Sequence, residues 1–292
     1  MNAQFFLNHE ALIRLGCFVA VLAVIVGWEL RAPRRALSLP RVRRWPANIT
    51  IVALNTLLLR LIFPTAAVGV AHLGQAQSWG LLNQWQIPPA VALLLGVALL
   101  DLAIYLQHVM VHAIPTLWRL HRMHHADLDY DVTTGSRFHP LEILLSMGIK
   151  FGVIAALGPS ALAVMLFEIL LNASAMFNHG NIRLPLALDR WLRWVIVTPD
   201  MHRVHHSVVM RETNSNFGFC LPWWDRLMGT YRAQPAAGHT GMTIGLEAWR
   251  DPRDAATLWG LLRMPFRSAA GPTMLDGGNR RLSEVTQRDD DD

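Results

Sequence analysis

Residues 89–125 read PAVALLLGVALLDLAIYLQHVMVHAIPTLWRLHRMHH. The first part, from Pro89 to His112, is apolar and long enough to cross about 30 Å of hydrocarbon as a helix. It ends in a pair of histidines, and the polar segment that follows contains three more. The stretch therefore predicts a membrane-spanning helix whose carboxyl end leads directly into a histidine-rich segment.

The composition of the 292-residue chain is typical of a membrane protein. Hydrophobic residues make up 52% and charged residues 16%, against about 25% charged in soluble domains, and the mean hydropathy is +0.28. One globular core of this length cannot bury so much apolar surface, so we expect the surplus to face lipid. A disordered chain, a coiled coil and collagen are excluded. Cys17 and Cys220 are too few and too distant for a disulfide framework or a thiolate metal site.

Three other apolar runs are candidates for spanning helices, and they cover residues 11–28, 49–73 and 141–177. Arg60 and Pro64 interrupt the second of these runs. The third is too long for one span and is divided at Gly158, which is followed by Pro and Ser. It therefore predicts a hairpin of two helices.

Arginines between the first two runs set the expected orientation. They are Arg31, Arg34, Arg35, Arg41, Arg43 and Arg44. By the positive-inside rule this loop is cytoplasmic, and counting spans alternately puts every histidine-rich segment in the same compartment. We interpret these arginines as topology signals and lipid-headgroup contacts, not as a nucleic-acid site. The first run is expected to be a retained anchor, because no small-residue cleavage site precedes the arginines.

The predicted fold class is all-α, a multi-pass transmembrane helical bundle with a cytoplasmic histidine-rich helical cap. Three segments are expected: 1–94 with the N-terminal spans and the arginine-rich loop, 95–235 with the histidines, and 236–292 as a cytoplasmic extension. The tail at 280–292, RRLSEVTQRDDDD, has no apolar periodicity and is expected to be disordered.

Five tryptophans are expected to be interfacial anchors: Trp191, Trp194, Trp223, Trp224 and Trp249.

Eight histidines occupy three short windows, which are HVMVH at 108–112, HRMHH at 121–125 and HRVHH at 202–206. Random placement of the chain's 13 histidines would put roughly 0.7 of them there. Residues three and four apart are neighbours on a helix, so each window is expected to direct two or three imidazoles to a common point. Buried unpaired imidazoles are unfavourable, and bound cations are the simplest compensation. Eight nitrogen ligands exceed the needs of one ion, so two metal ions are predicted.

Six segments extend the pattern beyond the windows: DLAIYLQHVMVH (101–112), LWRLHRMHH (117–125), RFHPLE (137–142), FNHGN (177–181), TPDMHRVHHS (198–207) and NFGFCLPWWDRLMGTY (216–231). As a set they resemble the fatty acid hydroxylase superfamily, also called the sterol desaturase family, of integral-membrane non-haem diiron enzymes. The resemblance covers about residues 95–235. Val109 stands where many members have Arg and Ala126 where Ser is common, and this leaves the substrate subgroup open.

The resemblance implies that nine histidines ligate two irons: His108, His112, His121, His124, His125, His179, His202, His205 and His206. It implies hydroxylation of a C–H bond in a lipid, sterol-like or other hydrophobic substrate, with O2 as co-substrate. Electrons would come from a reductase with ferredoxin or cytochrome b5. No catalytic residue beyond the metal ligands is expected. The alternatives are a desaturase on the same site and a nonenzymatic zinc-binding or zinc-transport protein.

Three polar residues are candidates for positions behind the ligands. Asp101 lies about two helical turns before His108, and it either orients an imidazole or partners another polar group in the bundle. His139 precedes a proline that can begin a helix, and it belongs either to the turn or to the site. Asp200 is expected to cap the helix that carries the third window.

Other charged residues have more ordinary interpretations. Glu168, in an apolar helix, is either functional or paired with Lys150 across the hairpin. Asp225 and Arg226 are expected to form a structural ion pair or to clamp a loop.

Overall fold

The computed structural model of the protein describes residues 3–63 and 65–268. Helices account for its regular structure there, and the two β-bridges, which join Pro33 to Ile182 and Ser207 to Ile244, are isolated. The all-α prediction is thus confirmed for the described residues. The tail at 280–292, which the sequence predicts to be disordered, lies outside them.

The long helices are α2 (Glu10–Arg31), α3 (Arg41–Ile62), α6 (Pro89–Ala113), α8 (Pro140–Leu157) and α9 (Ala161–Asn178). The shorter helices are α1 (Ala3–Asn8), α4 (Ala67–Ala76), α5 (Leu81–Gln84), α7 (Pro115–His125), α10 (Leu186–Leu192), α11 (Pro199–His205), α12 (Met210–Thr213), α13 (Trp223–Leu227), α14 (Gly238–Gly241), α15 (Pro252–Ala255) and α16 (Leu258–Arg263). Two 3-10 turns, η1 (Thr134–Ser136) and η2 (Met264–Phe266), complete the described chain.

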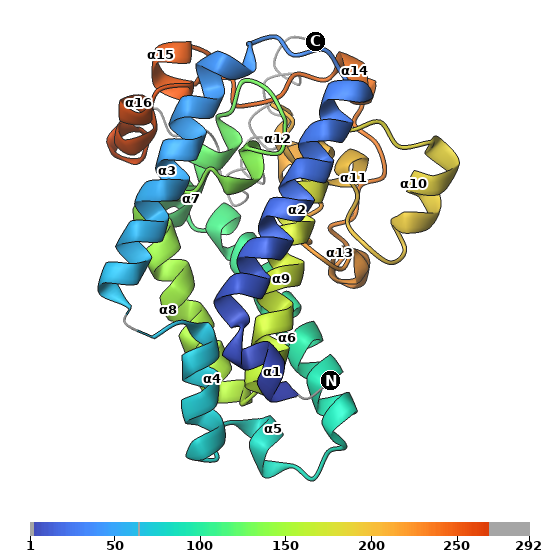
Figure 1. Cartoon of the computed structure of the whole chain (residues 1–292). Coiled ribbons are helices and arrows are strands. Elements are labelled where there is room, and N and C mark those ends of the chain that lie inside the picture. The colour runs from blue at the N-terminus through green and yellow to red at the C-terminus, as the bar shows by residue number, and fades with distance from the viewer. Residues whose placement is uncertain (1–2, 64, 269–292) are drawn as a thin grey trace, which may run out of the picture.

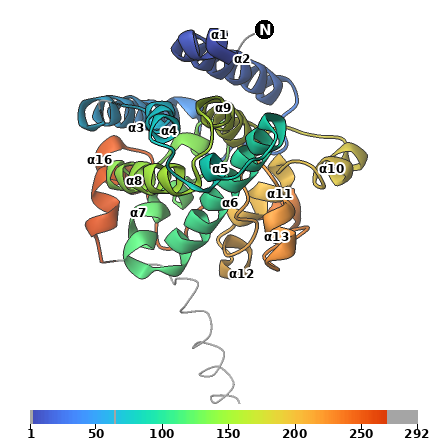
Figure 2. The ribbon, with the colours of Figure 1, turned by 90° about the horizontal axis from the view of Figure 1, so that it is seen from below.

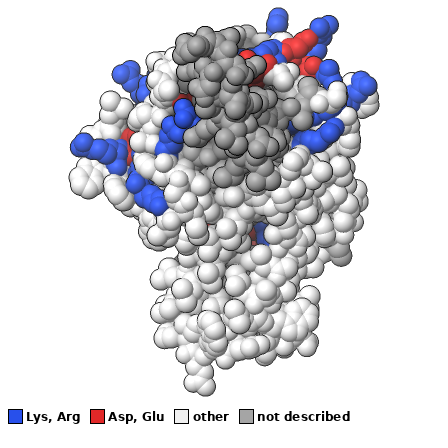
Figure 3. Space-filling model, turned by 180° about the vertical axis from the view of Figure 1, so that it is seen from behind, with Lys and Arg blue, Asp and Glu red and all other residues white. Residues whose placement is uncertain are grey.

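The long helices make the protein a multi-pass membrane protein. By length and composition, five helical segments of the described chain are able to cross a membrane. In Figure 1, α6, α8 and α9 occupy the lower and middle part of the molecule, and α2 and α3 run upward from the middle to the top. The helix α7 and the helices from α10 onward lie in the upper part. Figure 3 shows the same division on the surface, since Lys, Arg, Asp and Glu gather on the upper half and the lower half is almost uncharged.

The helix α9 is central to the bundle. It packs against α2, α4 and α6, and Figure 2 shows it between them when the molecule is seen from below. In the most apolar stretch of α9, 44% of the residues are buried. The corresponding share is 6% in α2, which lies at the edge of the bundle. The hairpin of α8 and α9 turns where the sequence predicts. Gly158 has a left-handed φ of 68° there, and a Cβ on it would collide with the backbone carbonyl of Trp79.

The second predicted span differs from the run at 49–73. Its helix α3 begins at Arg41, eight residues earlier, and ends at Ile62, and α4 then continues in the same general direction (Figure 1). The early start follows Pro40, which precedes the helix. Pro46 lies inside the helix and lacks the N–H for one backbone hydrogen bond, but the helix continues through it. The end falls two residues before Pro64, because proline disfavours helical geometry in the residue before it.

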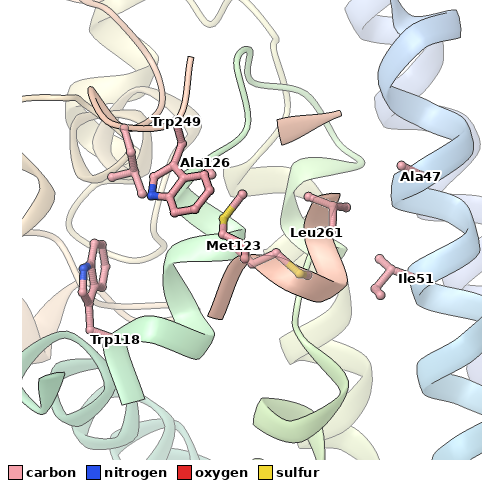
Figure 4. Packing of buried hydrophobic residues seen from close by; sticks show 9 residues of the cluster. Ala47, Ile51, Trp118, Met123, Ala126, Trp249 and Leu261 are labelled. Carbon is pink, nitrogen blue, oxygen red and sulfur yellow. The ribbon is translucent and has the colours of Figure 1, made fainter. Parts of the chain in front are cut away.

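A buried apolar cluster joins the amino-terminal part of the chain to the histidine-rich end. Figure 4 shows Ala47 and Ile51 of α3 facing Leu261 of α16, with Met123 and Trp118 of α7 on the other side. Trp249 belongs to the same cluster and is 2% exposed, so its predicted role as an interfacial anchor is wrong. The cluster fixes α7, which carries the second histidine window, against α3.

Four of the six arginines, Arg34, Arg35, Arg41 and Arg44, bind other parts of the protein, which corrects their interpretation as headgroup contacts. Arg44 is fully buried, and its guanidinium donates to Asp127 at 2.7 and 2.8 Å and to Asp131 at 2.7 Å. Arg34 donates to Asp200 at 3.0 Å. The other pairings are Arg41 with Glu29 at 3.4 Å, and Arg35 with the backbone carbonyls of His239 and Met242. These residues still count toward the positive-inside rule, but their side chains lock the first two spans onto the histidine-rich end.

We predict that Arg44→Met destabilises the protein strongly. The substitution leaves the Asp127 and Asp131 carboxylates buried without their main partner, which costs about 3–5 kcal/mol of unfolding free energy. The neighbouring Arg43 is exposed, so Arg43→Met is the matched control and is expected to change stability by less than about 0.5 kcal/mol. Thermal unfolding in detergent measures both. Equal midpoints for the two variants would contradict the buried network.

Candidate metal centre

Four separate parts of the chain bring nine histidines together. His108 and His112 lie in the last turns of α6, and α7 carries His121, His124 and His125. His179 follows the end of α9, and α11 carries the third window. Each of the nine side chains is 3% exposed or less, so the site is closed to bulk water.

The nine histidines form two groups, and within each group the candidate ligand atoms lie within 4.8 Å of one another. The first group is His108, His112, His121, His125 and His205. The second group is His124, His179, His202 and His206. The expectation that each window serves one common point is therefore wrong for the second and third windows. Neighbours such as His124 and His125 belong to different groups because consecutive helical residues point about 100° apart.

Ring nitrogens face each other within both groups. The Nε2 atoms of His108 and His205 are 3.1 Å apart, as are those of His112 and His125. In the second group the Nε2 atom of His179 is 3.2 Å from those of His124 and His202. Two imidazoles that bind one ion at about 2.1 Å, roughly at right angles, leave their nitrogens about 3 Å apart. The spacing therefore fits ligands of a shared cation.

Hydrogen bonds at Nδ1 show that the contact between His108 and His205 is not an ordinary hydrogen bond. The Nδ1 atoms of His108 and His205 lie 2.7 and 2.8 Å from the carbonyls of Phe217 and Ser215, which only accept hydrogen bonds. Both Nδ1 atoms must therefore carry the proton. In a neutral ring Nε2 then bears a lone pair, and two lone pairs face each other across 3.1 Å. A cation between them removes this repulsion.

Burial keeps the rings neutral. It is the largest cause lowering the pKa of five histidines well below the usual value, and nearby imidazoles add to the effect. These are His124, His125, His202, His205 and His206. Burial also lowers the pKa of His179 to about 3, although its hydrogen bond to the carbonyl of Ala175 acts in the opposite direction. Neutral imidazole is the form that binds transition metals.

The carboxylate of Glu142 was missed by the sequence analysis. Its Oε1 lies 2.6 Å from the Nδ1 atom of His121, and the side chain is buried. Glu142 is in the first turn of α8, within the RFHPLE segment. A carboxylate behind a metal-binding imidazole fixes its ring and raises its basicity. An acidic residue in a motif between two histidine windows was the signal available in the sequence.

Asp101 acts on the site through a loop. Its carboxylate accepts hydrogen bonds from the backbone N–H groups of Cys220 and Leu221 and from the indole of Trp224 at 2.9 Å. Within the described chain its hydrogen-bond partners include no histidine, which is the second of the two interpretations considered for it. Asp225 accepts from the N–H groups of Phe217 and Gly218 at 2.8 and 2.9 Å.

The two carboxylates therefore hold the segment whose Phe217 carbonyl orients His108. Asp225 is the loop clamp that the sequence allowed, and Arg226 is not its ion-pair partner among the described contacts. The guanidinium of Arg226 lies instead over the ring of Trp194, at 3.8 Å from the centroid.

The remaining candidates are placed outside the two histidine groups. His139 precedes α8, where its Nδ1 accepts from the N–H of Leu141, so it takes the structural role in the turn. The cap of α11 is Thr198, whose hydroxyl accepts from the N–H of Met201, and the capping role expected for Asp200 is wrong. Asp200 instead pairs with Arg34 and Arg203.

Glu168 is paired inside the membrane-spanning part. Its carboxylate binds Lys150 across the hairpin at 2.9 Å, as one interpretation predicts, and Arg14 of α2 at 3.0 Å. An intramembrane charge is thereby neutralised by neighbours on two other helices.

The fold and the site define a multi-pass membrane protein with two adjacent all-imidazole groups suited to transition metals. Residues 93–230 match the family model described as Fatty acid hydroxylase. The predicted resemblance to this family is therefore confirmed over these residues.

Curated relatives carry lipid-oxidising names. Ornithine lipid hydroxylase OlsE of Rhizobium tropici is 29% identical over 165 residues, which are 56% of this chain and 47% of that protein. Alkylglycerol monooxygenase of Xenopus tropicalis is 29% identical over 136 residues, or 45% of this chain and 28% of that protein. The human alkylglycerol monooxygenase is 28% identical, over 49% of this chain and 31% of that protein. The aligned region thus spans less than half of each of these relatives. No solved structure shows a significant match to the chain.

We predict that Glu142→Gln weakens metal binding by roughly 10- to 100-fold, because His121 loses the carboxylate that orients it. Glu247 is exposed, so Glu247→Gln is the matched control and is expected to leave the affinity unchanged. Titration of the purified protein with Co(II) against a competing chelator measures both. Wild-type affinity in Glu142→Gln would contradict the assigned contact.

Proposed function

We propose that the protein is a membrane-bound diiron oxygenase that hydroxylates a C–H bond of a membrane lipid, using O2 and external electrons. The observation that carries the proposal is the convergence of nine buried imidazoles on two neighbouring points beside membrane-spanning helices. The names of the relatives, a lipid hydroxylase and alkylglycerol monooxygenases, support a lipid substrate and a hydroxylated product.

The donor set supports iron. Imidazole suits iron, zinc, copper and nickel, and neither group contains a thiolate. Structural zinc is almost always bound by four ligands in a tetrahedron. The first group offers five nitrogens and so exceeds that need. We assign the first group to one iron and the second group to the other.

Two irons held by the two histidine groups would supply the oxidising power that inserts one atom of O2 into the C–H bond, and the other atom would leave as water with two electrons and two protons from the donor. The chain positions and shields that chemistry. Trp118 packs 4.8 Å from His112, Phe138 stacks 4.7 Å from His124, and Phe217 lies 5.1 Å from His112 between ring centroids. These rings exclude water, which would otherwise compete for the oxidant. Glu142 and the loop carbonyls hold the Nδ1 protons and so keep Nε2 free to bind.

The proposed orientation puts the histidine end of the molecule on the cytoplasmic side. The arginine-rich segment between α2 and α3 supports it through the positive-inside rule. A lipid chain then reaches the site from the bilayer, while electrons arrive from a cytoplasmic reductase with ferredoxin or cytochrome b5. In this proposal residues 1–94 anchor the domain of 95–235, and 236–292 are a cytoplasmic extension.

A desaturase on the same site is the closest alternative, because a second hydrogen abstraction in place of oxygen transfer gives an alkene.

We predict that cells containing the protein accumulate a lipid heavier by one oxygen atom, and that His205→Ala abolishes this product. His72 is exposed on α4, so His72→Ala serves as the control and is expected to retain the product. Lipid mass spectrometry measures the product. Immunoblotting of membranes shows whether the variants and the wild type are present in equal amounts. A product lighter by two hydrogens would identify a desaturase.

Metal identity separates the enzyme from a zinc-binding protein. We predict that the wild-type protein, loaded with ferrous iron, retains about two irons per chain and consumes O2 when reductant and lipid are present. Zinc-loaded protein is expected to consume none. Stable zinc together with no reductant-dependent O2 uptake after iron loading would favour the nonenzymatic alternative.

A further inference from the structure

A continuous apolar surface lies beside the histidine end of the bundle, on α10 and α13. We call it the platform and define it as residues 183–195 and 223–228. Its exposed large apolar side chains are Leu186, Leu188, Trp191, Trp194, Val195, Trp223, Leu227 and Met228. Trp191 and Leu227 are 70% and 73% exposed, which is unfavourable in water for such large apolar groups.

The two parts of the platform are joined as one unit. The indole of Trp223 donates to the carbonyl of Trp194 at 2.7 Å, and Arg226 donates to the carbonyl of Arg193 at 3.1 Å. The guanidinium of Arg226 is also held between the rings of Trp194 and Tyr231, at 3.8 and 4.0 Å from their centroids. The apolar side chains of α10 and α13 are therefore presented together.

The depth of the platform along the bundle is indicated by its contacts with Asp101. That carboxylate in α6 binds the indole of Trp224 and two N–H groups just before α13. Asp101 lies twelve residues after Pro89, the start of α6, which corresponds to about 18 Å at 1.5 Å per residue. A hydrocarbon layer is about 30 Å thick. The start of α13 is thus held at a level of α6 inside the span, not beyond its end.

The views agree with this depth. Figure 1 places α10 and α13 beside the bundle, below α12 and α14. Figure 2, seen from below, shows both helices to the side of the long helices, with their lower faces uncovered. The two helices of the platform therefore lie beside the spanning helices, and the chain leaves their lower faces open.

The charges of the platform complement an anionic surface. Arg183 and Arg190 are exposed. Both acidic residues of the platform are buried, Asp189 at 4% and Asp225 at 0% exposure, and Asp189 is paired with Arg193 at 2.7 Å. Exposed tryptophans combined with arginines are typical of the boundary between headgroups and acyl chains.

We propose that the platform is a monotopic membrane-binding surface. It inserts Trp191, Trp194, Trp223 and Leu227 into the leaflet on the histidine side and binds anionic headgroups with Arg183 and Arg190. This role does not depend on the bound metal or on the reaction. A soluble protein, such as an electron donor, is the competing occupant, and it requires the platform to face water.

Site-directed quenching in lipid nanodiscs tests the proposal. Cys17 and Cys220 are first replaced by Ala, and an environment-sensitive fluorophore is attached after Leu227→Cys, Trp191→Cys or Leu186→Cys. Arg253→Cys, on α15 with an 89% exposed side chain, is the matched control. Leu186→Cys repeats the α10 measurement without removing a tryptophan.

We expect a nitroxide near the headgroup of a spin-labelled phospholipid to quench the three platform labels several-fold more than the control. Iodide in the buffer is expected to show the reverse order. Iodide quenching as strong on the platform as at Arg253→Cys would show that the platform faces water, and it would overturn the proposal in favour of a soluble partner.

A second arm tests the charge. In phosphatidylcholine nanodiscs with phosphatidylglycerol, spin-labelled phosphatidylglycerol is expected to quench the Trp191→Cys label about two-fold more than spin-labelled phosphatidylcholine. Arg183→Gln combined with Arg190→Gln is expected to remove this preference. A preference that survives the double substitution would overturn the arginine contacts, and equal quenching by both lipids in the parent would overturn anionic selectivity.

Discussion

The structure depends on one constraint, which is the convergence of imidazole lone pairs inside a water-free space. His108 and His205 come from opposite ends of the domain, and each gives its Nδ1 proton to a backbone carbonyl. Their Nε2 lone pairs then face each other at 3.1 Å, an arrangement that is repulsive unless a cation lies between them. The same spacing recurs around His179. Metal binding and folding of this end of the molecule are therefore coupled.

Much of the chain serves to hold those rings from behind. Among the described residues Asp101 has no imidazole as a hydrogen-bond partner, yet with Asp225 it fixes the loop whose carbonyl orients His108. Glu142 holds His121 directly. The buried pairing of Arg44 with Asp127 and Asp131 fixes the segment after the second window to α3. A carboxylate thus contributes in one of two ways. It contacts an imidazole ring directly, or it holds the backbone whose carbonyl contacts the ring.

The same loop connects the histidine groups to the proposed membrane-binding surface. One end of the loop orients His108, and the other end continues into α13. Because Asp101 binds this loop from within a spanning helix, this carboxylate contributes both to the level of the platform and to the position of the loop behind His108. The bilayer boundary and the reacting centre are then held in a fixed relation.

The sequence by itself indicated the membrane helices (though not the bounds of the second), the turn at Gly158 and the eight histidines of the three windows, because apolar run length, glycine geometry and helical spacing are local properties. His179 entered only through the family resemblance. The sequence could not determine that His124 and His125 serve different groups, that Glu142 meets His121, or that Arg44 and Trp249 are buried. Those outcomes depend on contacts between residues far apart in the chain. Which side chains meet is decided by how α3, α7, α8 and α11 pack in the folded protein. Neither the spacing of residues nor the composition of a segment predicts that packing.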